Sequence, residues 1–353
     1  MGDTASLDSS NAHIVARDLI ARGRALRGQG EMIAFSLPGI RIDASFLTPG
    51  YADLCRRAVV NDPAYADGQQ QSLAVSIFDH ETRPDVPRAM WAETDFGIAP
   101  LATGLAPGGI EGAFDVDNYL WQFFDPATGE GVEAQKRPGA FPPWVASFPL
   151  RNFAHWGYQR LGWRLIHAGT LAVDGRGIML IGAGGSGKSG TSLAGVMGGL
   201  ESVGDDYVAM QLTEAGVRAY PVIKLMKQDA KGLARTGIDA AKFGLGEPNW
   251  QNKYEFDFEV LERGRRARQI DLQAILLPRI AHQARSTFTR APARAAMIGL
   301  APSNLQQLPG GWREGLGFTA EIARRLPAYY LDLSTDPSEI ADAIATFIAE
   351  PRS

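Results

Sequence analysis

The chain lacks what marks several common classes of protein. Its 353 residues include a single cysteine, Cys55, so no disulfide can form within the chain. No hydrophobic run approaches the roughly 20 residues that a membrane-spanning helix requires. The formal net charge is −4, whereas nucleic-acid-binding proteins usually carry a basic excess. These absences argue against a disulfide scaffold, a membrane protein and a nucleic-acid-binding protein.

The N-terminus also lacks the basic and apolar blocks of a secretion signal. It reads "MGDTASLDSSNAH", which is polar and acidic, and we expect residues 1–10 to form a disordered tail. Together with the lone cysteine, this predicts a cytoplasmic protein. The composition, 45% hydrophobic and 21% charged, is that of a globular chain long enough for two domains.

The first 140 residues carry no chemical motif that we can identify, and the chain has no internal repeat. Residues 11–26 have the apolar spacing of a helix, residues 70–84 read as a strand running into a turn, and residues 118–135 as a β-hairpin. A Pro- and Gly-rich stretch follows, "KRPGAFPPW". We therefore expect an N-terminal α+β domain over residues 11–140, with recognition of an acceptor as its function.

Beyond residue 140 the expected strands alternate with helices, which is typical of an α/β domain, here residues 141–353. Residues 151–169 read as a helix with inward-facing Phe153, Trp156 and Leu161. "RGIMLIG" at 176–182 reads as a short buried strand and 188–198 as the next helix. A later strand, "LQAILLP", is expected to stop at Pro278.

The last helix has clear start signals. Asp336 is the expected N-cap, Pro337 occupies the first turn, and Glu339 would complete a capping box. Its apolar stripe consists of Ile340, Ile344, Phe347 and Ile348.

A phosphate-binding loop is the strongest motif. "GAGGSGKS" at residues 182–189 fits Gly-x-x-x-x-Gly-Lys-Ser and stands between an apolar strand and a helix. The backbone N–H groups of such a loop cradle phosphate oxygens, Lys188 reaches the β and γ phosphates, and the Ser189 hydroxyl can ligate Mg²⁺. The alternative is a glycine-rich turn that packs a helix on a strand. The predicted nucleotide-binding residues are Gly182, Gly184, Gly185, Ser186, Gly187, Lys188, Ser189 and Gly190.

Two adjacent acidic residues follow the loop by one helix and one turn. In "ESVGDDYVAM", Asp205 and Asp206 come directly after Gly204, and we expect them beside the phosphates. One carboxylate can hold Mg²⁺ while the other accepts the proton of an attacking hydroxyl. Consecutive side chains of a strand point to opposite faces, so both can reach the phosphate only if the backbone turns at Gly204. The alternative is a solvated turn.

A histidine precedes the loop. "IHAGTLAVDGRGIMLIG" reads as a β-hairpin whose first strand begins with His167. A strand paired beside the loop strand would place His167 near the γ-phosphate. The alternative is a hydrogen-bonded core histidine.

Taken together, "HAGTLAVDGRGIMLIGAGGSGKSGTSL" and "SVGDDYVAM" resemble the kinase core of bacterial HPr kinase/phosphorylase and of related kinases found beside peptide-modification genes. The resemblance runs from about Trp144 to the end and includes "PVIKLMK", "LQAILLPRI" and "GLAPSNLQQLPG". It implies an α/β P-loop kinase core of the HPr kinase/phosphoenolpyruvate carboxykinase type.

The resemblance also implies roles for individual residues. Asp205 matches the position that exchanges a proton with the acceptor serine, His167 the active-site histidine, and Lys188 the lysine of the loop. The metal would be held by Ser189 and Asp206. Further candidates for phosphate or acceptor contacts, with solvated surface charge as the equal alternative, are Lys224, Lys253 and Arg279.

The sequence therefore predicts an ATP- and Mg²⁺-dependent kinase. It would transfer the γ-phosphoryl group to a hydroxyl, with serine favoured, on a peptide, protein or small molecule. HPr itself is disfavoured as the acceptor because we find no counterpart of the glycine-rich segment that HPr kinases carry after the core. Neither nucleic acid nor a membrane is expected as a partner, and a homo-oligomer is compatible with the sequence. The alternative is a nucleotide-binding regulatory or interaction protein that transfers nothing.

Overall fold

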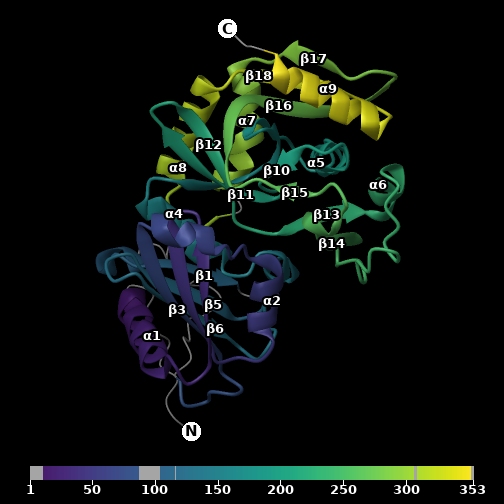
Figure 1. Cartoon of the computed structure of the whole chain (residues 1–353). Coiled ribbons are helices and arrows are strands. Elements are labelled where there is room, and N and C mark those ends of the chain that lie inside the picture. Colours follow the sequence, from purple (N-terminus) through teal and green to yellow (C-terminus); the bar gives the residue numbers. More distant parts are fainter. Residues whose placement is uncertain (1–10, 87–103, 116, 306–307, 351–353) are drawn as a thin grey trace. The chain divides into compact units, whose positions relative to one another are not determined.

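The chain has a mixed α/β fold (Figure 1). A computed structural model describes residues 11–86, 104–115, 117–305 and 308–350, so the expected tail at 1–10 lies outside the described residues. Two compact units result, Met1–Leu161 and Gly162–Ser353. Their division falls later than the boundary expected after residue 140, because helix α4 (Arg151–Arg160) packs on strands of the first unit. Within the described ranges, no helix is long and apolar enough to cross a membrane.

The first unit is built on a mixed sheet with the strand order β1-β2-β3-β6-β5-β4. Strands β2, β3 and β6 run parallel to one another, and the other pairings are antiparallel. The expected strand at 70–84 and the expected hairpin at 118–135 are both confirmed. The strands are β1 (Glu31–Leu37), β2 (Ile40–Phe46), β3 (Gln71–Asp79), β4 (Glu111–Asp115), β5 (Leu120–Asp125) and β6 (Glu130–Gln135).

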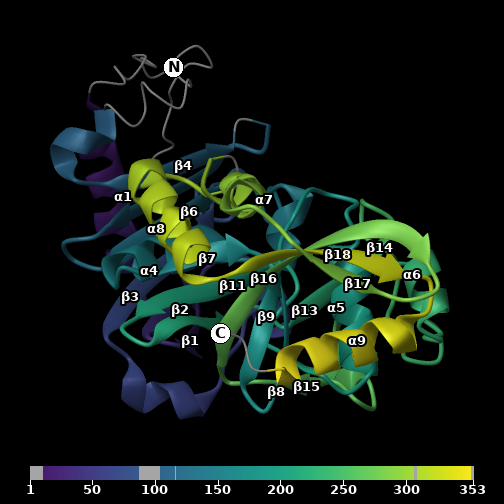
Figure 2. The same ribbon diagram turned by 90° about the horizontal axis from the view of Figure 1, so that it is seen from above.

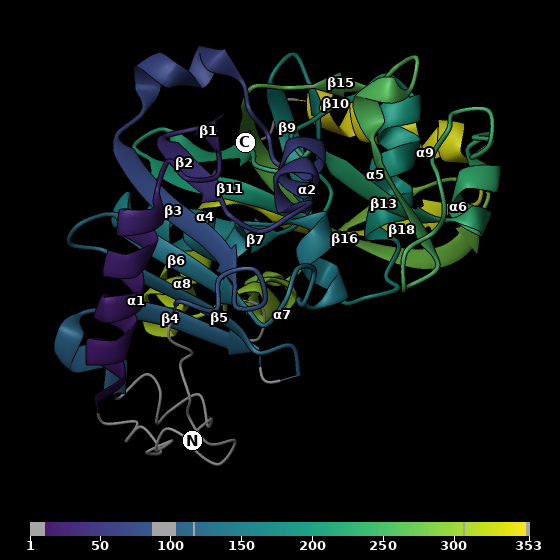
Figure 3. The same ribbon diagram turned by 90° about the horizontal axis from the view of Figure 1, so that it is seen from below.

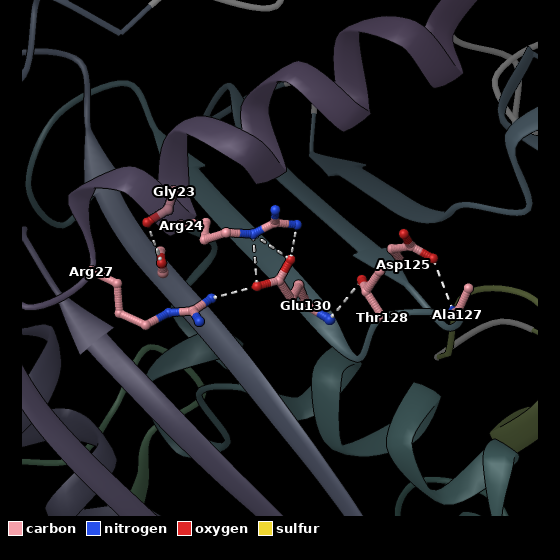
Figure 4. Close-up of polar contacts among 8 residues, drawn as sticks. Gly23, Arg24, Arg27, Asp125, Ala127, Thr128 and Glu130 are labelled. Carbon is pink, nitrogen blue, oxygen red and sulfur yellow. Dashed lines mark hydrogen bonds and ion pairs between the residues drawn. The ribbon is translucent and has the colours of Figure 1, made fainter.

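Helix α1 (Ala12–Leu26) confirms the helix expected at 11–26 and lies along this sheet (Figure 3). Ala16, Leu19 and Ile20 are buried against it. At its C-terminal end, the Glu130 carboxylate accepts hydrogen bonds from both Arg24 and Arg27 (Figure 4). The apolar face holds the helix on the sheet, and the ion pairs fix its end to the start of β6.

The remaining helices of this unit are short. Strand alternation puts α4 on the face opposite α1, because a Cβ on Gly157 of α4 would meet Leu73, whereas one on Gly23 of α1 would meet Ser76. The others are α2 (Tyr51–Ala58) and the 3-10 turns η2 (Pro63–Gly68), η4 (Ala106–Gly108) and η5 (Pro143–Ser147).

The helix expected over 151–169 is shorter in the structure, where α4 covers only Arg151–Arg160. Phe153 and Trp156 are buried as expected, but α4 ends at Arg160, and Gly162 with a φ of 70° turns the chain into strand β7. Leu165 and Ile166 pair there with a later strand, and this long-range pairing overrides the local helical pattern.

The second unit contains a larger sheet with the order β15-β10-β8-β9-β16-β12-β11-β7, to which β18 adds beside β16 and β17 beside β18. Its central strands β9, β16 and β18 are parallel. The strands are β7 (Arg164–His167), β8 (Gly169–Val173), β9 (Arg176–Leu180), β10 (Glu201–Ser202), β11 (Tyr207–Thr213), β12 (Gly216–Pro221), β15 (Arg265–Arg266), β16 (Ile270–Gln283), β17 (Thr287–Arg290) and β18 (Ala328–Ser334).

Helices cover both faces of this sheet (Figure 2). Along β9, Ile178 and Leu180 belong to one apolar cluster and Met179 to the other, as strand alternation requires. The first cluster includes α5 (Lys188–Met197) and α9 (Pro337–Ala349), and the second includes α7 (Ala293–Leu305) and α8 (Trp312–Arg325). A separate hairpin of β13 (Leu225–Asp229) and β14 (Lys253–Asp257) adjoins α6 (Ala230–Arg235) and the 3-10 turn η6 (Phe258–Val260).

Three sequence expectations need local correction here. Strand β16 does not stop at Pro278, which pairs only with β18 because β9 has already ended opposite Leu276. Asp336 caps α9 as expected, accepting from the N–H of Ser338, but Glu339 accepts from Ser286 and forms no capping box. The expected hairpin exists as β8 and β9, whereas His167 ends the preceding strand, β7.

Two helical glycines test the packing of the second unit. A Cβ on Gly195 of α5 would lie 2.5 Å from the buried Leu171 side chain, whereas one on Gly317 of α8 would meet nothing within 4 Å. Alanine gains about 1 kcal/mol of helix propensity at either site, but overlap in a packed core costs about 1–3 kcal/mol. We expect Gly317→Ala to raise the free energy of unfolding and Gly195→Ala to lower it. Urea unfolding of both variants measures this, and equal shifts would contradict the packing described.

Candidate functional site

The glycine-rich loop, residues 182–189, joins β9 to α5, as the sequence predicted. Ile181 still donates to the carbonyl of Leu276 at 3.1 Å, so the loop leaves the sheet directly after the last paired residue. Gly187 precedes α5 with a φ of 104°, and a Cβ there would lie 2.8 Å from Leu333. Both the backbone angle and the close approach therefore require glycine at the start of the helix.

Lys188 folds back over this loop. Its Nζ donates to the carbonyl oxygens of Gly182, at 2.5 Å, and Ala183, at 3.2 Å. Burial lowers the pKa of Lys188, which is only 8% exposed, although Asp205 and Asp206 act in the opposite direction. The lysine is thus a cation already positioned inside the loop, where the β and γ phosphates of a nucleotide would lie.

The acidic bend lies beside the loop because neighbouring strands hold it there. Ala168 donates its N–H to the carbonyl of Asp206, and Thr170 donates to that of Gly204, both at 3.0 Å. Gly204, with a φ of 155°, turns the backbone between them. Both aspartates are consequently brought to the N-terminal end of α5.

Asp205 is the more deeply buried carboxyl, with 3% exposure. Burial raises its pKa to about 6, against the opposing effect of the Ser192 and Ser189 hydroxyls. Within the described residues, its Oδ1 atom is buried without a hydrogen-bond partner. A Cβ on Gly169 would lie 3.2 Å from that oxygen, so glycine at 169 leaves room for the carboxyl.

Asp206 has a different environment. Its Oδ1 lies 3.1 Å from Nε2 of His167, and its Oδ2 accepts a hydrogen bond from Nζ of Lys227 at 2.7 Å. Although burial acts to raise the pKa of Asp206, Lys227 and His167 outweigh it and hold that pKa well below the ordinary range. Asp206 is therefore a charge-compensated carboxylate shared between β7, the acidic bend and β13.

This arrangement bears on which residues fit Mg²⁺. Magnesium prefers hard oxygen ligands, and a buried carboxylate oxygen without a partner supplies one at Asp205. The Ser189 hydroxyl acts to lower the pKa of the same carboxyl. Both oxygens of Asp206 already have partners, Nε2 of His167 and Nζ of Lys227. These contacts make Ser189 and Asp205 a second candidate pair for magnesium, and the pair Ser189 and Asp206 expected from the sequence stays a prediction.

A cavity of about 200 Å³ adjoins the loop and α5. Gly187, Gly190 and Thr191 form its wall on the loop side. Apolar groups from β16, β18 and α9 also line the cavity, together with polar groups that include Arg235 and His282. The cavity has the mixed apolar and polar character typical of small-molecule sites.

The three other candidate cations have different positions. Lys253 lies near enough to Lys188 for its charge to lower the pKa of Lys188. Lys224 lies instead near the charges of Asp257 and Arg266, and burial lowers its own pKa. Arg279 donates two hydrogen bonds to Asp332, at 2.6 and 2.7 Å, and its guanidinium lies over the Tyr330 ring. Only Lys253 is thus placed near the loop by these contacts.

Sequence reasoning missed Lys227 and Gly169. Lys227 occurs in "PVIKLMK", a segment in which Lys224 was the expected phosphate or acceptor contact. Lys227 lies within β13 whereas Lys224 precedes it, and this is known only once the pairing of that hairpin is known. Gly169 carries no sequence signal beyond its place two residues after His167, and it is the first residue of β8.

No protein-family model matches the chain. No curated protein matches it in sequence. Among solved structures, the Hpr(Ser) kinase/phosphatase from Coxiella burnetii is 12% identical with a TM-score of 0.29, covering 52% of this chain and 95% of its own.

The Asp206–Lys227 pair can be tested by stability measurements. Lys227→Met keeps an apolar stem but leaves a largely buried carboxylate with one cation fewer, which we expect to cost about 1–3 kcal/mol. Asp206→Asn should also destabilise. Because the two side chains touch, the double variant should lose less than the sum of the single losses by about 0.5 kcal/mol or more. Urea unfolding of the four proteins gives the coupling, and strictly additive losses would argue against the ion pair.

Proposed function

We propose that this protein is an ATP- and Mg²⁺-dependent kinase that transfers the γ-phosphoryl group to a hydroxyl, with serine favoured, on a peptide, protein or small molecule. One observation carries the proposal: Lys188, Asp205 and Asp206 meet at the N-terminal end of α5, at the end of the glycine-rich loop. Phosphoryl transfer needs a cation on the phosphates, an acidic residue for the metal and a group that takes the hydroxyl proton, and these residues would supply all three.

Nucleotide binding follows from the loop. The loop glycines allow close approach of backbone N–H groups to phosphate oxygens, and the N-terminal end of α5 favours an anion electrostatically. Lys188 would exchange the carbonyl oxygens of Gly182 and Ala183 for the β and γ phosphate oxygens. The cavity beside Gly190 and Thr191 would receive the nucleoside.

Magnesium would be held by the Ser189 hydroxyl and the Asp205 carboxylate. When bound, it neutralises negative charge on the phosphates and orients them. Asp205 is suited to this role because no Lys or Arg within the described residues forms an ion pair with its carboxyl. Gly169 keeps the approach to that carboxyl open.

The proton of the acceptor hydroxyl would be taken on the other side of the bend, by the Asp206–His167 pair. Lys227 holds Asp206 at 2.7 Å and would act as a positioning residue. This assignment exchanges the two aspartate roles expected from the sequence, since Asp205 adjoins Ser189 whereas Asp206 adjoins His167. The contacts favour this order, and substitution of each aspartate distinguishes it from the reverse.

Recognition of the acceptor is proposed for the first unit, which carries none of these groups. Incubation with γ-labelled ATP and a cell lysate tests the activity itself. We expect label in one protein or peptide acceptor, recovered as phosphoserine. Calorimetric ATP binding without transfer would favour the alternative, a nucleotide-binding regulatory protein.

Substitution of the loop lysine tests nucleotide binding. Lys188→Ala removes charge-assisted hydrogen bonds to the phosphates, each typically contributing about 1.5–3 kcal/mol, so ATP affinity should fall roughly tenfold or more. Titration calorimetry of Mg²⁺·ATP measures the affinity, with a circular dichroism spectrum to show that the variant is folded. Wild-type affinity in a folded Lys188→Ala protein would exclude the loop as the phosphate site.

Substitution of each aspartate tests the division of roles. Asp206→Asn should bind Mg²⁺·ATP nearly normally and lose transfer by about 10²–10⁴-fold, the usual contribution of general-base catalysis. Asp205→Asn should instead raise the Mg²⁺ concentration needed for half-maximal rate, because a metal-side carboxylate is lost. Transfer rates measured against Mg²⁺ separate the two effects. The opposite pattern would restore the order expected from the sequence.

A further inference from the structure

A second concave site lies in the same unit, away from the glycine-rich loop. It is a cavity of about 700 Å³ whose lining includes Arg176, Arg290, Arg324 and Arg325. Arg176 begins β9, whereas the loop follows the C-terminal end of this five-residue strand. At about 3.3 Å per residue, the two ends of β9 are roughly 13 Å apart. The cavity therefore lies at the N-terminal end of β9, and the glycine-rich loop lies at its C-terminal end.

The charge of this cavity is strongly positive. Among the described residues, the one carboxylate that pairs with any of these arginines is Glu321, which binds Arg324 and Arg325. Arg325 also donates to the carbonyl oxygens of Thr213 and Gly216. The cavity thus holds four guanidinium groups, two of which share one carboxylate, in a chain whose net charge is −4.

The other two arginines have neutral partners. Arg290 donates to the Tyr329 hydroxyl at 3.0 Å, and its guanidinium lies over the same ring. Arg176 lies against Gln273, whose side-chain oxygen accepts from it at 2.8 and 2.5 Å once the amide is oriented to satisfy both groups. These contacts orient the guanidiniums without neutralising them, which leaves their charge for a ligand.

The N-terminus of a helix also contributes positive potential to this cavity. Helix α7 begins at Ala293, which lines the cavity, so the positive end of its dipole adjoins the same space. A helix N-terminus and planar arginine forks both favour phosphate oxygens. The volume is within the range usual for small-molecule sites, about 300–1,000 Å³.

We propose that this cavity binds a small anion with at least two phosphate charges, and that it does so independently of the glycine-rich loop. Arg176 and Arg290 would make the main contacts, since they carry no carboxylate partner among the described residues. Arg324 and Arg325, already paired with Glu321, would add weaker attraction. The proposal does not depend on phosphoryl transfer.

Calorimetric titration with inorganic pyrophosphate tests this, carried out in the Lys188→Ala background so that binding at the loop is weakened. We expect about one equivalent to bind, and Arg176→Gln or Arg290→Gln to reduce the affinity about tenfold, as loss of a charge-assisted hydrogen bond implies. Arg218→Gln is the matched control, because it removes one charge from the same unit outside the cavity lining.

The outcomes separate the cavity from general attraction of anions. Unchanged affinity in Arg218→Gln together with weakened binding in the two cavity variants supports the site. Equal weakening in all three variants, or no binding in the Lys188→Ala background while the unsubstituted protein binds at its loop, overturns it. Because the titration lacks ATP and any acceptor, its failure leaves the proposed kinase activity untouched.

Discussion

Two backbone hydrogen bonds determine the geometry of the candidate site. The N–H groups of Ala168 and Thr170 donate to the carbonyls of Asp206 and Gly204 and thereby hold the acidic bend against the start of β8. Backbone bonds of this kind do not depend on the aspartate side chains. The carboxyls are therefore held next to α5 by the sheet itself, and their chemistry can be tuned by neighbouring residues without moving the bend.

Their surroundings shift the pKa values of these two adjacent carboxyls in opposite directions. Burial raises the pKa of Asp205 to about 6, whereas Lys227 and His167 hold the pKa of Asp206 far below its ordinary range. Two carboxylates close together repel each other, so separate environments are needed if both are to stay near one phosphate group. Lys227 from β13 and the space left by Gly169 provide those environments.

Much of this could be predicted from the sequence, and the limit is set by pairing over long distances. The loop at 182–189 and the helices beginning at 188 and 337 follow from local signals, as does the acidic bend after Gly204. Local signals gave wrong predictions where a segment pairs with a strand that is distant in sequence. Residues 164–167 look helical but pair with β11, and Pro278 is tolerated because β9 has already ended. Lys227 was missed for the same reason, since its position depends on the pairing of β13 with β14.

The resting position of the loop lysine could not be predicted from the sequence motif. Lys188 is not held out into solvent but donates to two carbonyl oxygens of its own loop. A ligand must replace these bonds, so a single weakly charged group gains little over the resting arrangement. A nucleotide that offers both β and γ oxygens to one ammonium group, with the N-terminal end of α5 behind it, gains more. If the loop binds a phosphorylated ligand, the resting contacts of Lys188 would favour di- and triphosphates over monophosphates, as the proposed donor site would need.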